Sequence, residues 1–514
     1  MSLSLPCLAA LLGVAPAPAP PPEAVRDAVR AHVRSHEGAI LREFAELLAI
    51  PNLASDAPGI RRNAESIVAL LGRRGVAARL LDGEGGPPAV YGELATPGAR
   101  RTIAVYAHYD GQPVDPAQWA GDPWTPVLRD RALEDGGREV PLALGAGEAG
   151  PEWRLYARSA SDDKAPIAAI LAALDALQAA RLPLSVNVKL LFEGEEEAGS
   201  PHLPRVLERN RELLRADGWL LCDGPVHQTR RMQVYFGARG VTDLEITTYG
   251  PLRPLHSGHY GNWAPNPAVA LAHLLAALRD TEGRILIAGF YDDVRPVTES
   301  ERRALAEVPE VEGELRHAFA LAETEAARLP ERIMLPALNL RGISAGGVGA
   351  RATNAIPSEA TASIDFRLVP DQTPDKVRER VEAHLRSRGY ALVHDVPTPE
   401  QRRSQPRLLR LAWGGGYPPA RTSMDLPFSR AVTATLEEAL GAPPVKMPTL
   451  GGSIPMYLFT DVLGAPVVGL PIVNHDNNQH AANENLRVQN LRDGILVYAV
   501  LLARLGERFP PASP

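Results

Sequence analysis

Short apolar runs alternate with longer helical patterns along the first half of the chain. Residues 102–107, 184–192 and 218–222 are strongly apolar and short, which is typical of buried strands. The stretches 24–49 and 165–180 have the length and composition of helices. This alternation predicts an α/β domain with a largely parallel sheet.

The pattern changes in the middle of the chain and then returns. Strands and helices predicted there form a compact α+β module, and they lie at 241–250, 268–280, 360–370, 374–389 and 390–396. The arginine- and glutamate-rich stretch 299–328 resembles a helical insertion in this module. From about Pro427 the α/β pattern resumes. We therefore predict one α/β domain in two parts, 23–236 and 416–514, interrupted by a smaller domain at 237–415.

The first 22 residues form a signal-like segment. The apolar run 5–15 is followed by a tract of prolines and alanines, as in the hydrophobic region of a signal peptide followed by a linker. No Lys or Arg precedes the run, and the prolines make a poor cleavage site. The segment favours export to the periplasm slightly over a cytoplasmic location. No other run is long and apolar enough to predict a membrane span.

Composition narrows the classes of protein that need to be considered. The chain has 514 residues, of which 45% are hydrophobic and 22% charged, as in soluble globular proteins of two or more domains. A formal net charge of -7 argues against a nucleic-acid partner. The only cysteines are Cys7 and Cys222, so a disulfide scaffold and a thiolate zinc module are excluded. Any bound metal must be held by histidines and carboxylates.

Histidines and carboxylates follow five of the apolar runs. In order along the chain they are His108 and Asp110, Asp162 and Asp163, the glutamates of 193–197, Asp223, and His475 with His480. Taken singly, each has an ordinary interpretation, such as a hydrogen-bonded pair, a helix start or a turn. Ligands of an open parallel sheet bind beyond the carboxyl ends of its strands. Five apolar runs that each end in histidine or carboxylate side chains therefore predict a metal site at one edge of the sheet.

The donor types predict a pair of divalent cations. Imidazole and carboxylate ligands without thiols suit Zn²⁺ best, with Mn²⁺ or Co²⁺ as alternatives. A two-ion site needs a bridging carboxylate and further ligands for each ion. His108 and Asp223 are assigned to one ion, Glu197 and His480 to the other, and Asp162 to both.

Two further groups complete this interpretation. Asp110, two residues beyond His108, is placed to accept the second N–H of that imidazole and so fix its tautomer. A glutamate beside the ligand Glu197 is then free to act as a base.

Nine short motifs lie in the two predicted domains. They are AHYDGQPVD (107–115), RSASDDKAP (158–166), FEGEEEAGS (192–200), LCDGP (221–225), HSGHYGN (256–262), TNAIP (353–357), FRLVP (366–370), GGSIP (451–455) and HAANEN (480–485). The complete set resembles the dinuclear-zinc metallopeptidases, a family that includes carnosinase-like dipeptidases, glutamate carboxypeptidase, aminoacylase and succinyl-diaminopimelate desuccinylase. The motifs occur in the family's order over most of the chain. Their Asp-Asp-Lys, Glu-Gly-x-Glu-Glu and Gly-Gly-Ser-Ile-Pro forms resemble the dipeptidase branch.

The resemblance implies a fold and a role for each residue of the larger domain. The fold is a three-layer, zinc-exopeptidase-like catalytic domain, interrupted by a ferredoxin-like lid and dimerisation domain. The implied metal ligands are the five already assigned. Glu196 is implied as the general base, which takes a proton from a metal-bridging water and passes it to the leaving amine. The peptide bond between Asp162 and Asp163 is implied to be cis.

The inserted domain is implied to complete the active site and to form a homodimer. His256 would reach the active site of the neighbouring subunit and stabilise the oxyanion. Asn354 and Arg367 would contact the substrate, with Arg367 pairing with its terminal carboxylate. Gly452 and Ser453 would add backbone and hydroxyl contacts.

The sequence departs from the family pattern in two places. Thr449 and Leu450 replace an Arg-Glu pair that usually precedes Gly-Gly-Ser-Ile-Pro, which removes a carboxylate able to recognise a free amino group. Ala165 replaces a common glycine. The predicted reaction is hydrolysis of the amide bond of dipeptides or short peptides next to a free C-terminal carboxylate. An N-acyl-amino-acid deacylase is the alternative enzyme. A non-catalytic metal-binding scaffold is disfavoured because no ligand and no base is missing.

Overall fold

The computed structural model describes residues 19–143, 148–322 and 328–509. Most of the predicted signal-like segment, including Cys7, lies outside the described residues. The chain divides into two units, each with its own core. Unit 1 comprises Met1–Phe236, Thr422–Lys446 and Leu458–Pro514, and unit 2 comprises Gly237–Arg421 and Met447–Tyr457.

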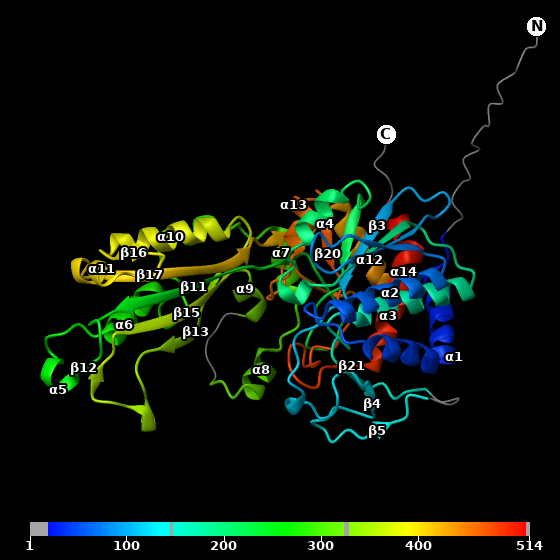
Figure 1. Cartoon of the computed structure of the whole chain (residues 1–514). Helices are drawn as coiled ribbons and strands as arrows, with labels where there is room; N and C mark the ends of the chain where they lie inside the picture. The colour runs from blue at the N-terminus through cyan, green and yellow to red at the C-terminus, as the bar shows by residue number, and fades with distance from the viewer. Residues whose placement is uncertain (1–18, 144–147, 323–327, 510–514) are drawn as a thin grey trace, which may run out of the picture. The chain divides into compact units, whose positions relative to one another are not determined.

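Unit 1 is built around an eight-stranded sheet in the order β1-β2-β7-β3-β8-β20-β9-β19 (Figure 1). The strands are β1 (Ala77–Leu81), β2 (Ala89–Leu94), β3 (Thr102–His108), β7 (Asn187–Glu193), β8 (Gly218–Leu221), β9 (Gln233–Tyr235), β19 (Val445–Met447) and β20 (Val467–Gly469). The central strands β7, β3, β8 and β20 are parallel, and β2 and β9 flank them in the antiparallel sense. The predicted α/β fold with a parallel centre is confirmed.

Helices cover both faces of this sheet, which gives the predicted three layers (Figure 1). They are α1 (Pro22–Leu48), α2 (Ala57–Arg73), α3 (Lys164–Ala179), α4 (Leu203–Arg209), α12 (Pro427–Leu440), α13 (Met456–Asp461) and α14 (Val488–Arg508). Ile103 and Val105 of β3 belong to the core that α3 and α14 share. Tyr106, the residue after Val105, contacts Phe459 of α13 on the other face. Both faces are buried, so the strand is apolar at consecutive positions.

A small separate sheet corrects one part of the sequence interpretation. It has the order β21-β6-β4-β5 and contains β4 (Val127–Arg129), β5 (Glu139–Val140), β6 (Arg154–Tyr156) and β21 (Asn485–Arg487). The run before Asp162 was expected to end a strand of the main sheet. It instead forms β6, which pairs with β4 and β21, and Asp162 lies in the turn before α3. The apolar pattern of a three-residue strand does not identify the sheet to which it belongs.

Unit 2 has a five-stranded sheet in the order β13-β15-β11-β17-β16. Its strands are β11 (Gly240–Tyr249), β13 (Ala337–Ser344), β15 (Glu359–Leu368), β16 (Ala391–Val393) and β17 (Leu408–Tyr417). With α6 (Pro267–Leu278) and α10 (Pro374–Ser387), the chain runs β11-α6-β13-β15-α10-β17, the ferredoxin-like order. Both helices share one hydrophobic core with alternate residues of β11, β15 and β17.

The remaining elements of unit 2 are short. They are α5 (Ser257–Tyr260), α7 (Glu299–Glu307), α8 (Glu312–Ala318), α9 (Leu329–Ile333), α11 (Pro399–Ser404) and the strand pairs β10 (Gly237–Ala238) with β18 (Ala420–Arg421) and β12 (Leu255–His256) with β14 (Ala355–Ile356). The stretch 299–328 expected to be helical contains α7 and α8, and its residues 323–327 lie outside the described part. Thr298 and Glu301 form a capping box at the start of α7.

The limits of the two units differ from the predicted boundaries in two places. The expected boundary after residue 415 falls inside β17, and unit 2 continues to Arg421. Glycine at position 416 allows the strand to continue beside β11. A Cβ atom there would lie 2.4 Å from the carbonyl oxygen of Val241, which is too close for any other residue without a shift of the backbone. The stretch Met447–Tyr457, which was assigned to the larger domain, belongs to unit 2.

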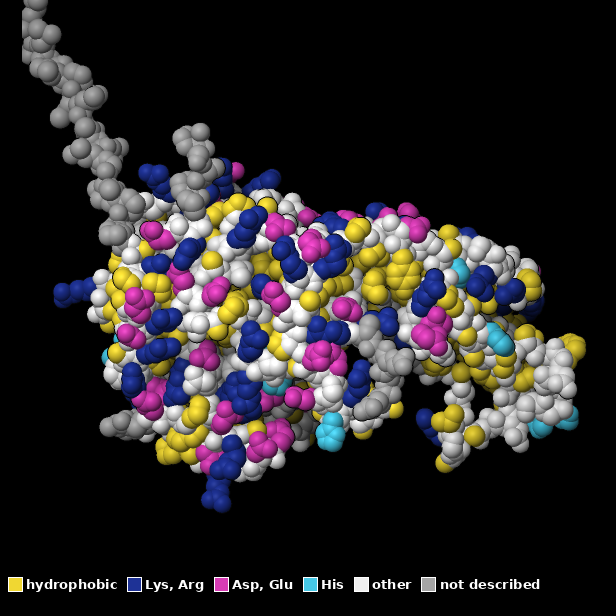
Figure 2. Space-filling model, turned by 180° about the vertical axis from the view of Figure 1, so that it is seen from behind, with side chains coloured by type: hydrophobic (Ala, Val, Ile, Leu, Met, Phe, Trp, Pro, Cys, Tyr) yellow, Lys and Arg dark blue, Asp and Glu magenta, His cyan; other side chains and the backbone are white. Residues whose placement is uncertain are grey.

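The surface carries both signs of charge. Lys and Arg side chains are interspersed with Asp and Glu side chains over the face shown in Figure 2. No helix of the described residues has the length and apolar character needed to cross a membrane.

Candidate metal centre

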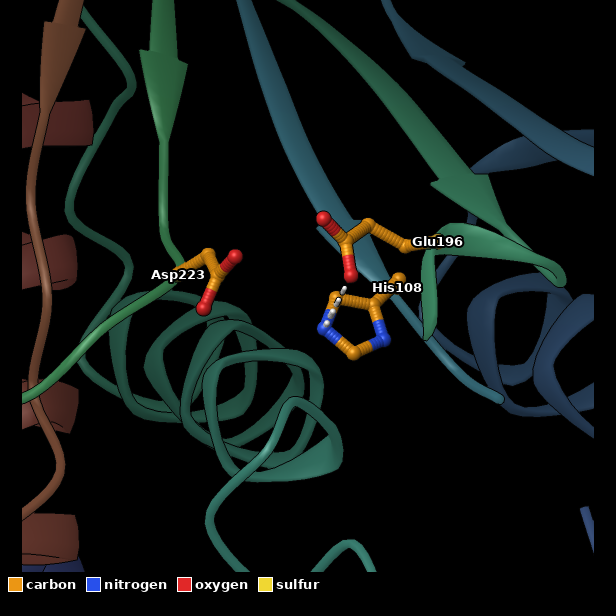
Figure 3. Close-up of side chains that lie close together, drawn as sticks. All are labelled: His108, Glu196 and Asp223. Carbon is orange, nitrogen blue, oxygen red and sulfur yellow. Dashed lines mark ion pairs between the residues drawn. The ribbon is translucent and has the colours of Figure 1, made fainter. Parts of the chain in front are cut away.

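Three strands of the main sheet deliver one group of potential ligands. His108 is the last residue of β3, Asp223 follows β8, and Glu196 begins the 3₁₀ turn Glu196–Ala198 that follows β7. One ligand atom from each of these three residues lies within 4.8 Å of the others. Figure 3 shows the three side chains around a common space beyond the strand ends. Nε2 of His108 lies 3.9 Å from Oε2 of Glu196. Parallel strands bring these residues together because their carboxyl ends share one edge.

A second group comes from Asp162, Glu197 and His480, and its ligand atoms also lie within 4.8 Å of one another. Asp162 connects the two groups. Its Oδ1 lies 3.0 Å from Nε2 of His108, and its Oδ2 lies 3.1 Å from Nε2 of His480. One carboxylate that faces a histidine with each oxygen has the arrangement of a bridging ligand. The peptide bond between Asp162 and Asp163 is cis, as the resemblance implied.

Asp110 is buried and orients residues of both groups. Its Oδ1 lies 3.3 Å from Nδ1 of His108, on the side of the ring that faces away from Asp162. The same carboxylate accepts the backbone N–H groups of Glu196 and Glu197, each at 3.1 Å. The side chain therefore holds the turn that carries these two glutamates as well as the ring of His108.

The carboxylates of the centre are crowded and buried, and this shifts their pKa values upward. Burial and the charge of Asp162 raise the pKa of Glu197 to about 8 and that of Asp223 to about 6. Burial also raises the pKa of Glu196 well above its usual range; the charge of His108 opposes this shift, and the charges of Asp223 and Glu197 add to it. These shifts show an excess of negative charge that a cation would offset.

The pKa values of the two histidines are also raised, whereas the pKa of Asp162 is lowered. Burial disfavours the charged form of His108, but its contacts with Asp110 and Asp162 outweigh burial and raise its pKa. The pKa of His480 is raised to about 9, mainly by its hydrogen bond with Asp162. Burial would raise the pKa of Asp162, yet both histidines hold it well below its usual range. The imidazoles of His108 and His480 together with the carboxylates form a set of donors that fits two divalent cations.

The other two glutamates of FEGEEEAGS are structural. Glu193 is 3% exposed and accepts a hydrogen bond of 2.5 Å from the hydroxyl of Tyr106. Glu195 is 6% exposed, accepts the backbone N–H of His202 at 2.8 Å and also contacts the ring of His202. Both side chains are therefore buried and hydrogen-bonded, and neither is a solvated surface charge. Gly199 and Ser200 adopt left-handed conformations that turn the chain after the site.

The predicted substrate residues all lie in unit 2, in two places. His256 and Asn354 are both exposed, and they lie together where β12 pairs with β14. The backbone N–H of Ser257 donates to the carbonyl of Asn354 at 2.9 Å. At the other place, Nη1 of Arg367 donates to Oγ of Ser453 at 2.9 Å. Gly452 is held there by the backbone N–H of Arg239, which donates to its carbonyl at 3.1 Å.

Comparison with known proteins decides the family. The model of Peptidase family M20/M25/M40 matches residues 104–504, which is more than half of the chain. This protein belongs to that family. It is therefore a metal-dependent peptidase, and the resemblance inferred from its motifs is confirmed.

Relatives of this M20 peptidase include dipeptidases and a carboxypeptidase. The Cys-Gly metallodipeptidase DUG1 of Saccharomyces cerevisiae is 28% identical over 431 residues, which cover 82% of this chain and 82% of that protein. A crystal structure of an M20 family metallo-carboxypeptidase from Sulfolobus solfataricus is 30% identical, with a TM-score of 0.74, and covers 91% of this chain and 99% of that one. Human carnosine dipeptidase 1 shares the fold at 23% identity, with a TM-score of 0.72 over 95% of this chain and all of that one.

The structure adds residues of the M20 peptidase that the sequence interpretation missed. Nε2 of Gln112 donates to Oε2 of Glu197 at 2.8 Å. Glu484 and Arg158 form a fully buried ion pair of 2.8 Å beside Asp162. All three residues lie inside motifs recognised in the sequence. The sequence did not show which residues they contact, because those residues come from distant parts of the chain.

Proposed function

We propose that this peptidase hydrolyses dipeptides or short peptides at the amide bond next to a free C-terminal carboxylate. The observation that carries the proposal is the position of Asp162 between two groups of ligands, with one oxygen toward His108 and one toward His480. His108, Asp162 and Asp223 would hold one ion, and Asp162, Glu197 and His480 the other. Zn²⁺ is the proposed metal, with Mn²⁺ or Co²⁺ as alternatives, because the donors are imidazoles and carboxylates.

Glu196 is proposed as the general base. Bound ions would polarise the amide carbonyl and lower the pKa of a water molecule. Glu196 lies beside His108 and Asp223 and is only partly exposed, so it can take a proton from that water and return it to the leaving amine. Asp110 supports both steps, because it orients His108 and holds the backbone of Glu196.

Substrate recognition is assigned to unit 2. Arg367 is proposed to bind the terminal carboxylate, because its guanidinium is partly exposed and Ser453 orients one end of it. Gly452 and Ser453 would add the backbone and hydroxyl contacts, and Asn354 a contact to the substrate backbone. His256 is proposed to stabilise the oxyanion in the active site of a second copy of the chain. Its exposure next to Asn354 supports a homodimer formed through this domain.

An N-acyl-amino-acid deacylase is the second candidate. The observation that favours it is Thr449-Leu450, where a carboxylate for a free amino group is missing: Thr449 is buried and Leu450 is partly exposed. Relatives whose names state a dipeptide substrate, such as the human Beta-Ala-His dipeptidase at 28% identity over 306 residues, support the dipeptidase instead.

A substrate panel separates the two candidates. The zinc-loaded protein would be assayed with unblocked dipeptides, with the same dipeptides after N-acetylation, and with N-acetyl and N-succinyl amino acids. A dipeptidase shows a kcat/KM at least tenfold higher for the unblocked dipeptides. A higher kcat/KM for the N-acyl amino acids would establish the deacylase. Absence of hydrolysis of every compound by metal-loaded protein would contradict both.

A further inference from the structure

A buried carboxylate outside the proposed ligand set joins the two loops that carry Asp162 and His480. Glu484 follows His480 by four residues and is 0% exposed. Its Oε1 accepts the backbone N–H groups of Ser161 at 2.9 Å and of Asp162 at 2.8 Å. Glu484, on the loop of the proposed ligand His480, therefore holds the main chain of the proposed ligand Asp162.

The second oxygen of Glu484 is also fully used. Its Oε2 accepts Nη1 of Arg158 at 2.8 Å and the backbone N–H of Ser159 at 2.9 Å. Four donors around one carboxylate require its ionised form, which only accepts hydrogen bonds. An amide in its place would turn an NH₂ group toward two of these donors and leave them unpaired in the interior.

Arg158 extends the connection back toward His480. It is 2% exposed, and its Nη2 donates to the carbonyl of Ala481 at 3.2 Å. Its guanidinium lies 5.1 Å from the ring of Trp119, which restricts it further. The buried pair of Glu484 and Arg158 thus contacts the residue after His480 and the backbone of Asp162 at the same time.

The loop that carries His480 leaves the imidazole close to the surface. The side chain of His480 is 54% exposed, and it contacts the carboxylates of Asp162 at 3.1 Å and Glu197 at 3.2 Å. Local hydrogen bonds hold the backbone beside it, such as that from the N–H of Ala481 to the carbonyl of Asn478 at 3.0 Å. The first fully buried side chain after His480 is that of Glu484. Glu484 is therefore the first buried attachment of this loop on the C-terminal side of the imidazole.

We propose that Glu484, paired with Arg158, is a positioning residue that fixes Asp162 and His480 in the geometry needed to bind the same ion. This inference rests on the proposed ligand set. Within the described part of the chain, the side-chain hydrogen bonds of Glu484 run to Arg158, Ser159, Ser161 and Asp162, and to none of the proposed substrate residues. Its loss is expected to act on metal affinity first and on the chemical step only through the metal.

The test measures zinc affinity by competition with a fluorescent chelator. Glu484→Gln keeps the shape of the side chain and is expected to bind zinc about 10–100-fold more weakly than the original protein. Activity should recover at saturating zinc. A merely structural role would lower the melting temperature of the metal-free protein and leave the zinc affinity of its folded fraction unchanged, and that result would overturn the proposal.

Asp476→Asn is the matched control. Asp476 lies on the same loop and pairs with Arg154 at 2.6 Å, and among the described residues its side chain has no hydrogen bond or ion pair with Asp162 or Arg158. Its zinc affinity should equal that of the original protein. Equal losses in both variants would show a general loosening of the loop and would overturn the specific role of Glu484.

Two further variants separate this inference from the ligand assignment. His480→Ala should weaken zinc binding; if it does not, the proposed ligand set fails and the role of Glu484 fails with it. If His480→Ala weakens binding and Glu484→Gln does not, only the role of Glu484 is overturned. If Glu484→Gln does not fold, the zinc affinity of Arg158→Lys tests the proposal instead. Lysine has a single terminal nitrogen and cannot donate to Glu484 and to the carbonyl of Ala481 as Arg158 does. An unchanged zinc affinity in Arg158→Lys would overturn the proposal.

Discussion

The imidazole of His480 lies 3.1 Å from the carboxylate of Asp162, although 318 residues separate the two in sequence. The contact joins the first and the last of the three segments of unit 1, Met1–Phe236 and Leu458–Pro514. The side chains of His480 and Asp162 are also proposed to bind the same ion. Binding of metal is therefore expected to change their contact with each other. The predictions below use this dependence.

Glu196→Gln is expected to lower kcat by about 10²–10⁴-fold, the usual contribution of a general base. The amide has nearly the same shape but cannot take a proton, so fold and zinc content should be retained. Zinc content by elemental analysis and kcat on the preferred substrate check this. Glu195→Gln is the neighbouring control, since Glu195 contacts His202 instead of the centre. A Glu196→Gln protein with normal turnover would show that another group is the base.

Metal-free protein is expected to lose stability as the pH rises from about 5 to 8. The pKa values of Glu197 and Asp223 are raised in the folded protein, to about 8 and about 6. The folded state therefore holds protons that the unfolded chain has released, and each rise in pH favours unfolding. The melting temperature of chelator-treated protein measures this. The decrease of the melting temperature with pH should be smaller in Glu197→Gln and after zinc is added. A melting temperature that rises between about pH 5 and 8 would contradict the prediction.

Arg367→Met should lower kcat/KM by about 10–100-fold for substrates with a free C-terminal carboxylate, mainly through KM. A charge-assisted hydrogen bond contributes about 1.5–3 kcal/mol, and each 1.4 kcal/mol is a factor of ten. The same substrates with an amidated C-terminus should be hydrolysed equally by both proteins. Arg341→Met is the control, because Arg341 pairs with Asp243 on the same sheet. Equal losses for free and amidated substrates would remove Arg367 from carboxylate recognition.

His256→Ala should lower kcat by about 10²–10³-fold without changing zinc affinity, the usual effect of losing an oxyanion donor. His259→Ala is the control, because its ring lies 4.6 Å from that of His256 on the same exposed segment. Mixing His256→Ala with an inactive Glu196→Gln protein tests the proposed exchange between subunits, since each mixed dimer would contain one intact site. No recovery of activity on mixing, with dimers shown by light scattering, would place His256 in the site of its own chain.

Much of the centre was predictable from sequence because strand ends are local features. An apolar run followed by His108, by the glutamates of 193–197 or by Asp223 indicates both a buried strand and the edge at which it stops. The ferredoxin-like order of unit 2 was implied by the resemblance, and its strands and helices were visible as periodic segments. Asp162 and His480 were named as ligands from their types, although the reason given for Asp162 was wrong, since β6 is not part of the main sheet.

The sequence by itself determined which side chains could bind metal and in which order the strands present them. Only the tertiary structure decided that one carboxylate of Asp162 faces both His108 and His480, that Asp110 holds the backbone of Glu196, and that Glu484 holds the backbone of Asp162. The physical reason is distance along the chain. Periodicity reports which face of an element is buried, but a hydrogen bond between residues 54 to 322 positions apart exists only after the packed core has brought both segments together.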